Sequence, residues 1–385
     1  MNQKMLVLFN IYWAILSMQT LFNEVFDNYF STRIKLGGKA NFVASPDQNA
    51  LLKHIPLLIE NLLKSIGKDY RYKIKGSIGN GNIARVPWVG IFRKDITINA
   101  ENGYYIVLLF SEDMSCCYLS LNQGITAVEK LYTKRFALKK MREASNQAVT
   151  YLDCDPDVWR GAIDLRASAD LGRAYEAAAI ASYRYDRTAI PTVEVFFKDL
   201  IALIAHYDRL CHLFGKNLHS LFTVSESEYQ KVVLEKASQP GELASEEPAG
   251  QPWQQTDAGA LGITGFSRSP IVAARAIRAA DFSCEIDPTH KTFISRAKRN
   301  QYVEAHHLIP MSQQGLFQTS LDVVENVVAL CATCHRMLHF GMDSDRKDIL
   351  ISLLNKRKHK LIANSIDVKS ADFLKYYSSA AILEE

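Results

Sequence analysis

Three of the seven cysteines and five of the ten histidines lie within one 56-residue window in the C-terminal third of this 385-residue chain, and no other feature constrains the fold as much. The residues are Cys284, His290, His306, His307, Cys331, Cys334, His335 and His339. Thiolate and imidazole groups are the preferred protein ligands of zinc and related metals. Such dense clustering of these residue types usually reflects metal binding. We therefore predict a small domain that depends on metal for its stability.

The spacing Cys331-x2-Cys334 is that of half a tetrahedral zinc site. We predict that Cys284 and His290 complete a structural Zn²⁺ site in which protein side chains occupy all four positions. The usual partner would be a second Cys-x2-Cys pair, but Asp287 stands where its second cysteine would be. Two alternatives remain open from the sequence: ligation by Asp287 instead of His290, and an incomplete site.

The remaining histidines fall on or beside two of three expected elements. Tyr302–Leu308 and Val327–Leu330 have the composition of short strands, with a bend expected before Pro310. A helix over 336–340 would place His335 and His339, four residues apart, on one face. The expected arrangement is a β-hairpin followed by a helix, with four imidazoles and an amide converging. A unit this small needs a metal ion to stabilise it.

These imidazoles have the chemistry that a hydrolytic reaction needs. Histidines can bind a divalent cation that neutralises charge developing on a phosphate and stabilises the leaving oxygen. A neutral imidazole can take the proton of an attacking water, because its ordinary pKa is about 6.5. The alternative is that these histidines are further structural zinc ligands or ordinary core residues. We favour a catalytic centre, because His-His, Asn and His-x3-His occur in this order beside a Cys-x2-Cys pair.

The segment 268–341 resembles HNH endonucleases of the restriction type, in the subgroup with the pattern E-x-H-H-L-x-P … N … L-C-x-x-C-H-x-x-x-H. The resemblance implies that His307 is the general base and that His306 is a ligand of Mg²⁺ or another divalent cation. It also implies that His335 and His339 belong to the metal site or contact the phosphate, with His335 counted among the catalytic residues. Asn326 matches the middle asparagine, which braces the hairpin and orients the base.

The first half of the chain reads as one mixed α/β domain. Strand-like segments separated by turn signals predict an antiparallel meander, over Tyr70–Lys75, Trp88–Phe92, Tyr104–Phe110 and Cys117–Leu121. Helical segments are expected over Ala50–Ile66, Thr126–Thr150, Leu171–Tyr183 and Val193–Phe214.

This half resembles the MrcB-like N-terminal domain over roughly residues 24–221. The resemblance is carried by Lys75–Gly79, Val86–Phe92, Gly103–Tyr105, Leu119–Gly124 and Tyr183–Pro191. Domains of this family occur in restriction proteins directed at modified cytosine, so the resemblance implies a DNA-sensing role. A modified-base reader would extrude the base into an aromatic pocket. Trp88, Tyr104 and Tyr105 could line such a pocket, although strand aromatics are more often core residues.

The predicted fold class is α+β, with three segments. Residues 1–223 form the mixed α/β domain with its antiparallel meander and helices. Residues 224–267 are expected to be a flexible linker, because 224–259 contain seven acids and two bases. Residues 268–385 form the zinc-stabilised ββα-metal domain with a C-terminal helical extension.

Two basic clusters are candidate DNA contacts. In the C-terminal domain they are Lys356, Arg357, Lys358 and Lys360; in the N-terminal domain they are Lys134, Lys139 and Lys140. The overall charge of only +4 does not indicate nucleic-acid binding, so the argument depends on these local groups. A solvated helix face is the alternative explanation.

Composition also indicates where the chain works. The other cysteines, Cys116, Cys117, Cys154 and Cys211, have the context of small core residues in a reducing cytoplasm. No apolar run is long enough to span a bilayer, and the apolar N-terminal segment continues as an amphipathic helix.

The sequence therefore predicts a metal-dependent DNA endonuclease of restriction or anti-phage defence, directed by its N-terminal domain. One site cuts one strand, so a monomer should nick, and double-strand breaks would require a homodimer or two successive events. One rival is a nuclease that defence-system partner proteins activate. A rival of another class is a zinc-stabilised DNA-binding module without catalysis.

Overall fold

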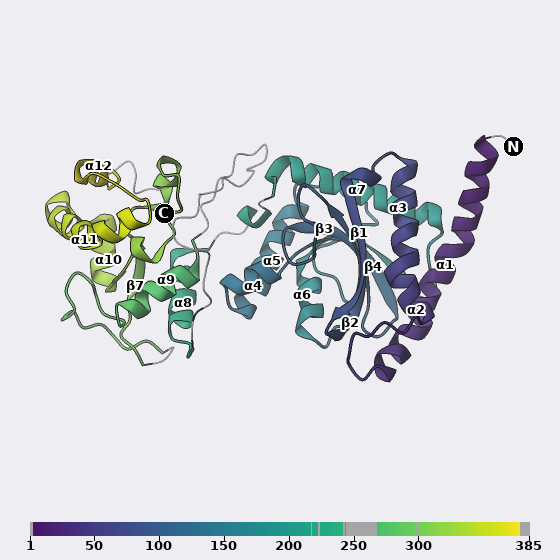
Figure 1. The fold of residues 1–385 in the computed structure, drawn as a ribbon, viewed down its shortest axis with the longest axis horizontal. Helices are drawn as coiled ribbons and strands as arrows, with labels where there is room; N and C mark the ends of the chain where they lie inside the picture. The colour runs from purple at the N-terminus through teal and green to yellow at the C-terminus, as the bar shows by residue number, and fades with distance from the viewer. Residues whose placement is uncertain are drawn as a thin grey trace. The chain divides into compact units, whose positions relative to one another are not determined.

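The structure, a computed structural model, describes residues 3–216, 218–221, 224–241, 243, 268–296 and 299–377. Its contacts divide the chain into two compact units (Figure 1). Among the described residues, the first unit contains the elements up to η3 (Leu218–Leu221), and the second contains those from α8 (Glu226–Ala237) onwards. An antiparallel sheet with helices in the first unit and a ββα element in the second confirm the predicted α+β class.

The first unit begins with helices. They are α1 (Gln3–Lys35), α2 (Pro46–Asn49), the π-helical segment η1 (Ala50–His54) and α3 (Ile55–Ser65). The amphipathic character predicted for α1 is present in its second half, where Phe22, Val25, Phe26 and Tyr29 are buried at helical spacing. No helix in the described part of the chain combines the length and the apolar character needed to cross a membrane.

A six-stranded antiparallel sheet forms the centre of this unit, in the order β1-β2-β3-β4-β6-β5. Its strands are β1 (Tyr72–Asn80), β2 (Asn82–Arg93), β3 (Tyr104–Phe110), β4 (Cys116–Gln123), β5 (Trp159–Arg160) and β6 (Ala179–Asp186). A short helix, η2 (Asp69–Arg71), precedes β1. The first four strands pair consecutively, which confirms the predicted meander.

Helices cover both faces of the sheet, and the alternation of side chains along β3 explains why. Tyr105, Val107 and Leu109 pack in one apolar cluster, which includes Tyr175 of α6 (Asp170–Ala178). Their neighbours Ile106, Leu108 and Phe110 pack in another, with side chains from α1, α3 and α7 (Val193–Phe214). Because successive strand residues point to opposite faces, a strand buried on both sides is apolar throughout. Figure 1 shows α6 on the opposite side of the sheet from α3 and α7.

Two predicted helices differ from the structure. The segment 126–150 forms α4 (Thr126–Leu131) and α5 (Lys134–Val149), interrupted where Tyr132 and Thr133 adopt extended backbone angles. The helix predicted to run to Tyr183 ends at Ala178, and β6 begins at once. Pairing of β6 with β4 overrides the helix propensity of its alanines.

The second unit is built around a hairpin. β7 (Glu304–His307) pairs antiparallel with β8 (Val327–Leu330), and α10 (Ala332–Phe340) follows. Around them lie α9 (Pro270–Ala279), η4 (Met311–Leu316), η5 (Val324–Asn326), α11 (Asp343–Ala363) and α12 (Ser370–Lys375). The last two helices form the predicted C-terminal extension. Its residues after 377 lie outside the described residues.

The first part of the predicted linker is a helix instead. Residues 226–237 form α8, which begins with a capping box between Ser225 and Glu228. Tyr229 and Val233 of α8 pack with side chains from α9, β7 and β8, so the helix belongs to the second unit. Most of the rest of the predicted linker lies outside the described residues.

Candidate active site and metal centres

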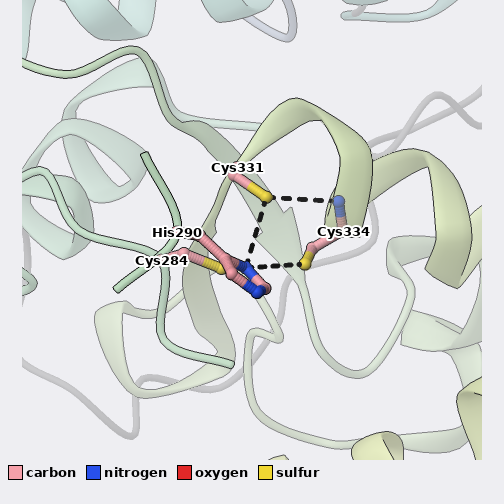
Figure 2. A group of neighbouring side chains, drawn as sticks. All are labelled: Cys284, His290, Cys331 and Cys334. Carbon is pink, nitrogen blue, oxygen red and sulfur yellow. Dashed lines mark hydrogen bonds between the residues drawn. The ribbon is translucent and has the colours of Figure 1, made fainter. Parts of the chain in front are cut away.

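The side chains predicted to bind zinc lie together. The candidate ligand atoms of Cys284, His290, Cys331 and Cys334 all lie within 4.8 Å of one another. Nδ1 of His290 is 3.4 Å from Sγ of Cys334 and 3.7 Å from Sγ of Cys331 (Figure 2). A sulfur about 2.3 Å and a nitrogen about 2.0 Å from a tetrahedral zinc would lie about 3.5 Å apart. The four side chains therefore have the spacing that a zinc ion needs.

The electrostatics of this cluster also suit a cation. Burial would raise the pKa of the Cys284 thiol, but backbone N–H groups of Asp287 and Cys331 and the ring of His290 lower it to about 7. For Cys334, burial and the neighbouring thiols of Cys331 and Cys284 raise the pKa. Several thiolates cannot be charged at such close range without a compensating cation, and a bound Zn²⁺ provides that compensation.

Asp287 is placed outside the ligand set. Its Oδ1 accepts hydrogen bonds from the backbone N–H of Thr289 at 2.8 Å and from the Thr289 hydroxyl at 2.7 Å. Its other oxygen lies 3.5 Å from Nε2 of His290, the nitrogen that faces away from the thiols. Asp287 thus shapes the turn before His290 and orients the imidazole.

A second cluster consists of His306 on β7 and of His335 and His339 on α10. Nε2 of His339 lies 3.1 Å from Nδ1 of His306 and 3.1 Å from Nε2 of His335. Two nitrogens about 2.1 Å from one cation are separated by about 3.0 Å at right angles and about 3.4 Å at tetrahedral angles. The spacing therefore suits three nitrogens bound to one ion.

Hydrogen bonds fix the tautomer of two of these imidazoles. The hydroxyl of Tyr377 donates to the carbonyl of Leu308 at 2.7 Å, so it accepts from Nε2 of His306 at 2.9 Å. This leaves the Nδ1 lone pair of His306 facing the cluster. Nδ1 of His335 donates to the Glu304 carboxylate at 2.7 Å, which leaves its Nε2 lone pair facing the cluster. A ligating histidine whose other nitrogen is held in this way is the usual arrangement at metal sites.

The protonation of the cluster agrees with this arrangement. Burial, followed by the nearby rings of His335 and His339, lowers the pKa of His306 well below its ordinary value. His306 is therefore neutral, as a metal ligand must be. The Glu304 carboxylate behind His335 has a lowered pKa: its burial opposes ionisation, but hydrogen bonds from His335 and Tyr302 outweigh that effect.

His307, the expected base, has separate partners. Its Nε2 lies 2.8 Å from Oδ1 of Asp322, a carboxylate whose Oδ2 accepts the backbone N–H of Ser269 at 2.6 Å. Since an ionised carboxylate only accepts, His307 donates from Nε2 and keeps the lone pair of Nδ1. Both β7 histidines are buried, with 3–4% of their surface exposed. His306 and His307 are the last two residues of β7, so the bend expected before Pro310 comes after both histidines.

Asn326 braces the chain after β7. Its Oδ1 accepts the N–H of Ile309 at 2.8 Å, and its Nδ2 donates to the carbonyls of Ile309 and Leu321, both at 2.9 Å. Its backbone carbonyl accepts the N–H of Leu308 at 2.7 Å. Asn326 is fully buried and has no hydrogen bond to His307, so it shapes the loop that leaves β7 rather than the ring itself.

One helix connects the two clusters. Sγ of Cys331 caps α10 by accepting the N–H of Cys334 at 3.4 Å (Figure 2). His335 follows Cys334 directly, and His339 lies one turn later. The orientation of His335 and His339 therefore depends on the zinc-binding cluster, because that cluster holds the start of α10.

Several predicted DNA contacts are occupied by internal partners. Lys134 pairs with Asp170 at 2.6 Å, and Lys139 with Glu143 at 3.7 Å. Lys140 differs from the prediction, because it is only 3% exposed and bonds Glu143 at 2.9 Å, which removes it from the surface.

The second cluster divides in the same way. Arg357 also differs from the prediction: it makes a bidentate pair with Glu285 at 2.7 and 2.6 Å and so anchors α11 to the turn after Cys284. Lys356 is exposed and donates to the carbonyl of Glu285, whereas Lys358 and Lys360 are simply exposed.

The aromatic residues considered for a base pocket are mainly core. Tyr104 and Tyr105 are fully buried, and Trp88 is half-buried against Phe92. Burial raises the pKa of both tyrosines far above the ordinary value. Tyr104 and Tyr105 are therefore core residues of the first unit.

Sequence reasoning missed the residues that hold the histidines. Asp322 and Tyr377 are isolated polar residues 15 and 71 positions from their partners, and nothing in their local sequence marks them. Glu304 stood in the recognised pattern without a role. Its position two residues before His306 was an available signal.

Comparison with known proteins agrees with this geometry. Residues 35–212 match the family described as MrcB-like, N-terminal domain, and residues 290–341 match HNH endonuclease. A segment of 79 residues is 34% identical to the type IV methyl-directed restriction enzyme EcoKMcrA of Escherichia coli (strain K12). The match covers 20% of this chain and only 26% of that relative. The chain therefore combines an MrcB-like N-terminal domain with an HNH endonuclease domain.

Proposed function

We propose that this protein is a metal-dependent DNA endonuclease that hydrolyses phosphodiester bonds at the His306, His335 and His339 cluster. The observation that carries the proposal is the convergence of one nitrogen from each of three imidazoles, with His307 next to His306 on β7 and hydrogen-bonded to Asp322. A DNA-binding module without catalysis would need the zinc cluster but not this second set. The HNH domain match supports the same assignment.

Each residue has a defined part in this proposal. A divalent cation held by the three histidines would neutralise charge on the scissile phosphate and stabilise the leaving oxygen. His307 takes the proton of the attacking water at Nδ1, and Asp322 stabilises the resulting imidazolium through Nε2. Glu304 and Tyr377 hold two of the metal ligands in the required tautomer. Cys284, His290, Cys331 and Cys334 bind a structural Zn²⁺.

The donor set suggests which cation the active site prefers. Mg²⁺ favours oxygen ligands, whereas imidazole nitrogens favour transition metals. All three candidate donors in this cluster are nitrogens. We therefore propose that Mn²⁺, Co²⁺ or Ni²⁺ supports cleavage better than Mg²⁺.

The proposed setting is restriction of foreign DNA in the cytoplasm. EcoKMcrA is named a methyl-directed restriction enzyme, and this chain carries an MrcB-like N-terminal domain ahead of its HNH domain. We propose that this domain directs cutting to DNA with modified cytosine. A single active site nicks one strand, so a double-strand break requires a homodimer or two successive events.

The test is cleavage of supercoiled plasmid, with or without cytosine modification, by the full chain. Reactions contain Mg²⁺, Mn²⁺, Co²⁺, Ni²⁺ or EDTA, and a His307→Ala variant serves as the control. We expect metal-dependent conversion to open circle, faster on modified plasmid and lost in the variant. If zinc-loaded protein binds the plasmid but no condition yields cutting, the nuclease assignment is wrong for the isolated chain. Recovery of cutting on addition of partner proteins would then favour the partner-activated nuclease.

A further inference from the structure

A short basic segment lies between the zinc cluster and β7, and its cations have no role in the site described above. Residues 291–303 contain Lys291, Arg296, Lys298 and Arg299 and no carboxylate. Ile294 and Gln301 form an antiparallel bridge, and the N–H of Tyr302 donates to the carbonyl of Phe293 at 3.0 Å. We refer to residues 292–296 and 299–302 as the basic hairpin.

The basic hairpin is a built structure. Two hydrogen bonds join Thr292 to the opposite side of the hairpin. Its N–H donates to Oε1 of Gln301 at 3.1 Å, and its hydroxyl donates to the carbonyl of Tyr302 at 2.8 Å. The N–H of Ser295 donates to the carbonyl of Asn300 at 2.8 Å and closes the turn. These bonds fix which side chains the hairpin presents.

The cations of this segment are available to a partner. Lys291, Arg296 and Arg299 are exposed, and none forms an ion pair within the part of the chain that the structure describes. Four of the seven cations predicted from the sequence to contact DNA differ from them, since Lys134, Lys139, Lys140 and Arg357 have carboxylate partners. An unpaired guanidinium can bind phosphate without first losing an internal carboxylate.

Large apolar side chains accompany these cations. Phe293 is 64% exposed and Ile294 is 56% exposed, and both precede the basic turn in the chain. The Phe293 ring stacks on Tyr302, with centroids 4.6 Å apart and planes 21° apart. Exposed apolar residues beside arginines are typical of surfaces that press into a DNA groove, where the apolar group packs on sugars or base edges.

The hairpin is connected to the metal site at its base. The hydroxyl of Tyr302 donates to Glu304 at 2.6 Å, and the other oxygen of Glu304 accepts from His335 at 2.7 Å. Tyr302 thus contacts Glu304, the carboxylate that orients His335, and stacks on the exposed ring of Phe293. A surface in this position would meet the nucleic acid close to the phosphate that is cut.

We propose that the basic hairpin is a DNA-contacting element in which Arg296 and Arg299 bind backbone phosphates and Phe293 and Ile294 pack into the groove beside the cleaved bond. This inference rests on the proposed nuclease function and adds the surface that holds the duplex there. Its partner is double-stranded DNA, because the segment offers positive charge and apolar area and has no carboxylate to repel phosphate.

The experiment compares four double variants of the full chain, each with zinc content checked. Arg296→Gln with Arg299→Gln removes the cations, and Phe293→Ala with Ile294→Ala removes the apolar groups. The matched controls are Lys347→Gln with Lys369→Gln, which remove two exposed lysines of the same unit, and Leu316→Ala with Ile362→Ala, which remove two exposed apolar side chains. Nicking kcat/KM is measured with Mn²⁺, and duplex affinity is measured by anisotropy in a His307→Ala background at several salt concentrations.

We expect the arginine variant to reduce the slope of log affinity against log salt by about 1.8, at about 0.9 per lost phosphate contact, and to lower kcat/KM at least about tenfold. The apolar variant should keep the slope and lower affinity by about fivefold or more. Both controls should match the parent chain. If the hairpin variants also match the parent while the parent binds and nicks DNA, the hairpin proposal is wrong and the nuclease proposal stands. If the parent neither binds nor nicks DNA, both are wrong.

Discussion

Asp322 is the residue whose contribution to the active site is easiest to isolate, because it contacts His307 and none of the candidate metal ligands. Its carboxylate accepts from Nε2 of His307 and so selects the tautomer with a basic Nδ1. Such pairing also stabilises the imidazolium that forms when the proton is taken.

We predict that Asp322→Asn lowers kcat for nicking by at least about tenfold with little change in KM. The amide can donate its N–H to His307, which favours the tautomer with the proton on Nδ1. Metal titration should show unchanged affinity, since the imidazole cluster is untouched. Asp367→Asn, at an exposed aspartate of the same unit, is the control. An equal loss in metal affinity would mean that Asp322 supports the cluster instead.

The zinc cluster yields a second prediction at the residue scale, because Asp287 and His290 are alternative ligands in the sequence and the structure places only His290 among the ligands. His290→Ala, which removes a ligand, should weaken zinc binding far more than Asp287→Ala, which removes only the group that orients the imidazole and should cost about tenfold. His290→Cys should bind zinc, because it supplies a fourth thiolate. The measurement is zinc retention against a competing chelator. Loss of zinc in Asp287→Ala as large as in His290→Ala would contradict the assignment.

At the scale of elements, α8 supplies what a third strand would otherwise provide. Oε1 of Gln230 accepts the N–H of Ala305 at 2.8 Å, and its Nε2 donates to the Ala305 carbonyl at 2.7 Å. The side-chain amide therefore satisfies the free edge of β7 as a neighbouring backbone would. A two-stranded sheet is marginal alone, and an unsatisfied edge would weaken it further.

We predict that Gln230→Ala lowers the free energy of unfolding of the second unit by about 2 kcal/mol or more, because two buried backbone groups lose their partners. The change should appear in urea unfolding followed by zinc release and circular dichroism. Lys231→Ala, at the next position and on the exposed face of the same helix, should have little effect. Equal stability of the two variants would show that water satisfies Ala305.

The elements also show what the sequence could and could not predict. The meander followed from alternating apolar runs between turn signals, and the ββα element from the spacing of histidines around two short strands. The acidic composition of residues 224–259 indicates a linker, whereas the capping box of Ser225 with Glu228 and the buried spacing of Tyr229 and Val233 indicate the helix α8. β6 was missed because its pairing with β4 is a long-range contact that no local pattern contains.

For the whole molecule, the two units have separate apolar cores among the described residues, so each should fold alone. We predict that a fragment from residue 224 onwards binds zinc and nicks modified and unmodified plasmid at the same rate. The full chain should prefer modified plasmid, since the proposed reader lies in the first unit. A fragment that keeps the preference would place the reader in the HNH unit. A fragment that begins at residue 268 should be less stable, because it lacks α8.

Across the whole molecule, the Cys and His residues of the candidate site were easier to predict than the residues that hold them in place. Cys and His are rare and chemically specific, so their spacing alone identified both clusters. Asp322, Tyr377 and Gln230 are common residue types whose roles arise only after folding brings distant segments together. A single sequence contains no signal for such long-range contacts.

The hydrogen bond from His306 to Tyr377 joins two residues that are added at different times during translation. The three imidazoles are complete once His339 has been added, yet the group that sets the tautomer of His306 is added 38 residues later. A chain that ends before Tyr377 therefore has all three imidazoles but lacks the hydroxyl that selects the tautomer of His306.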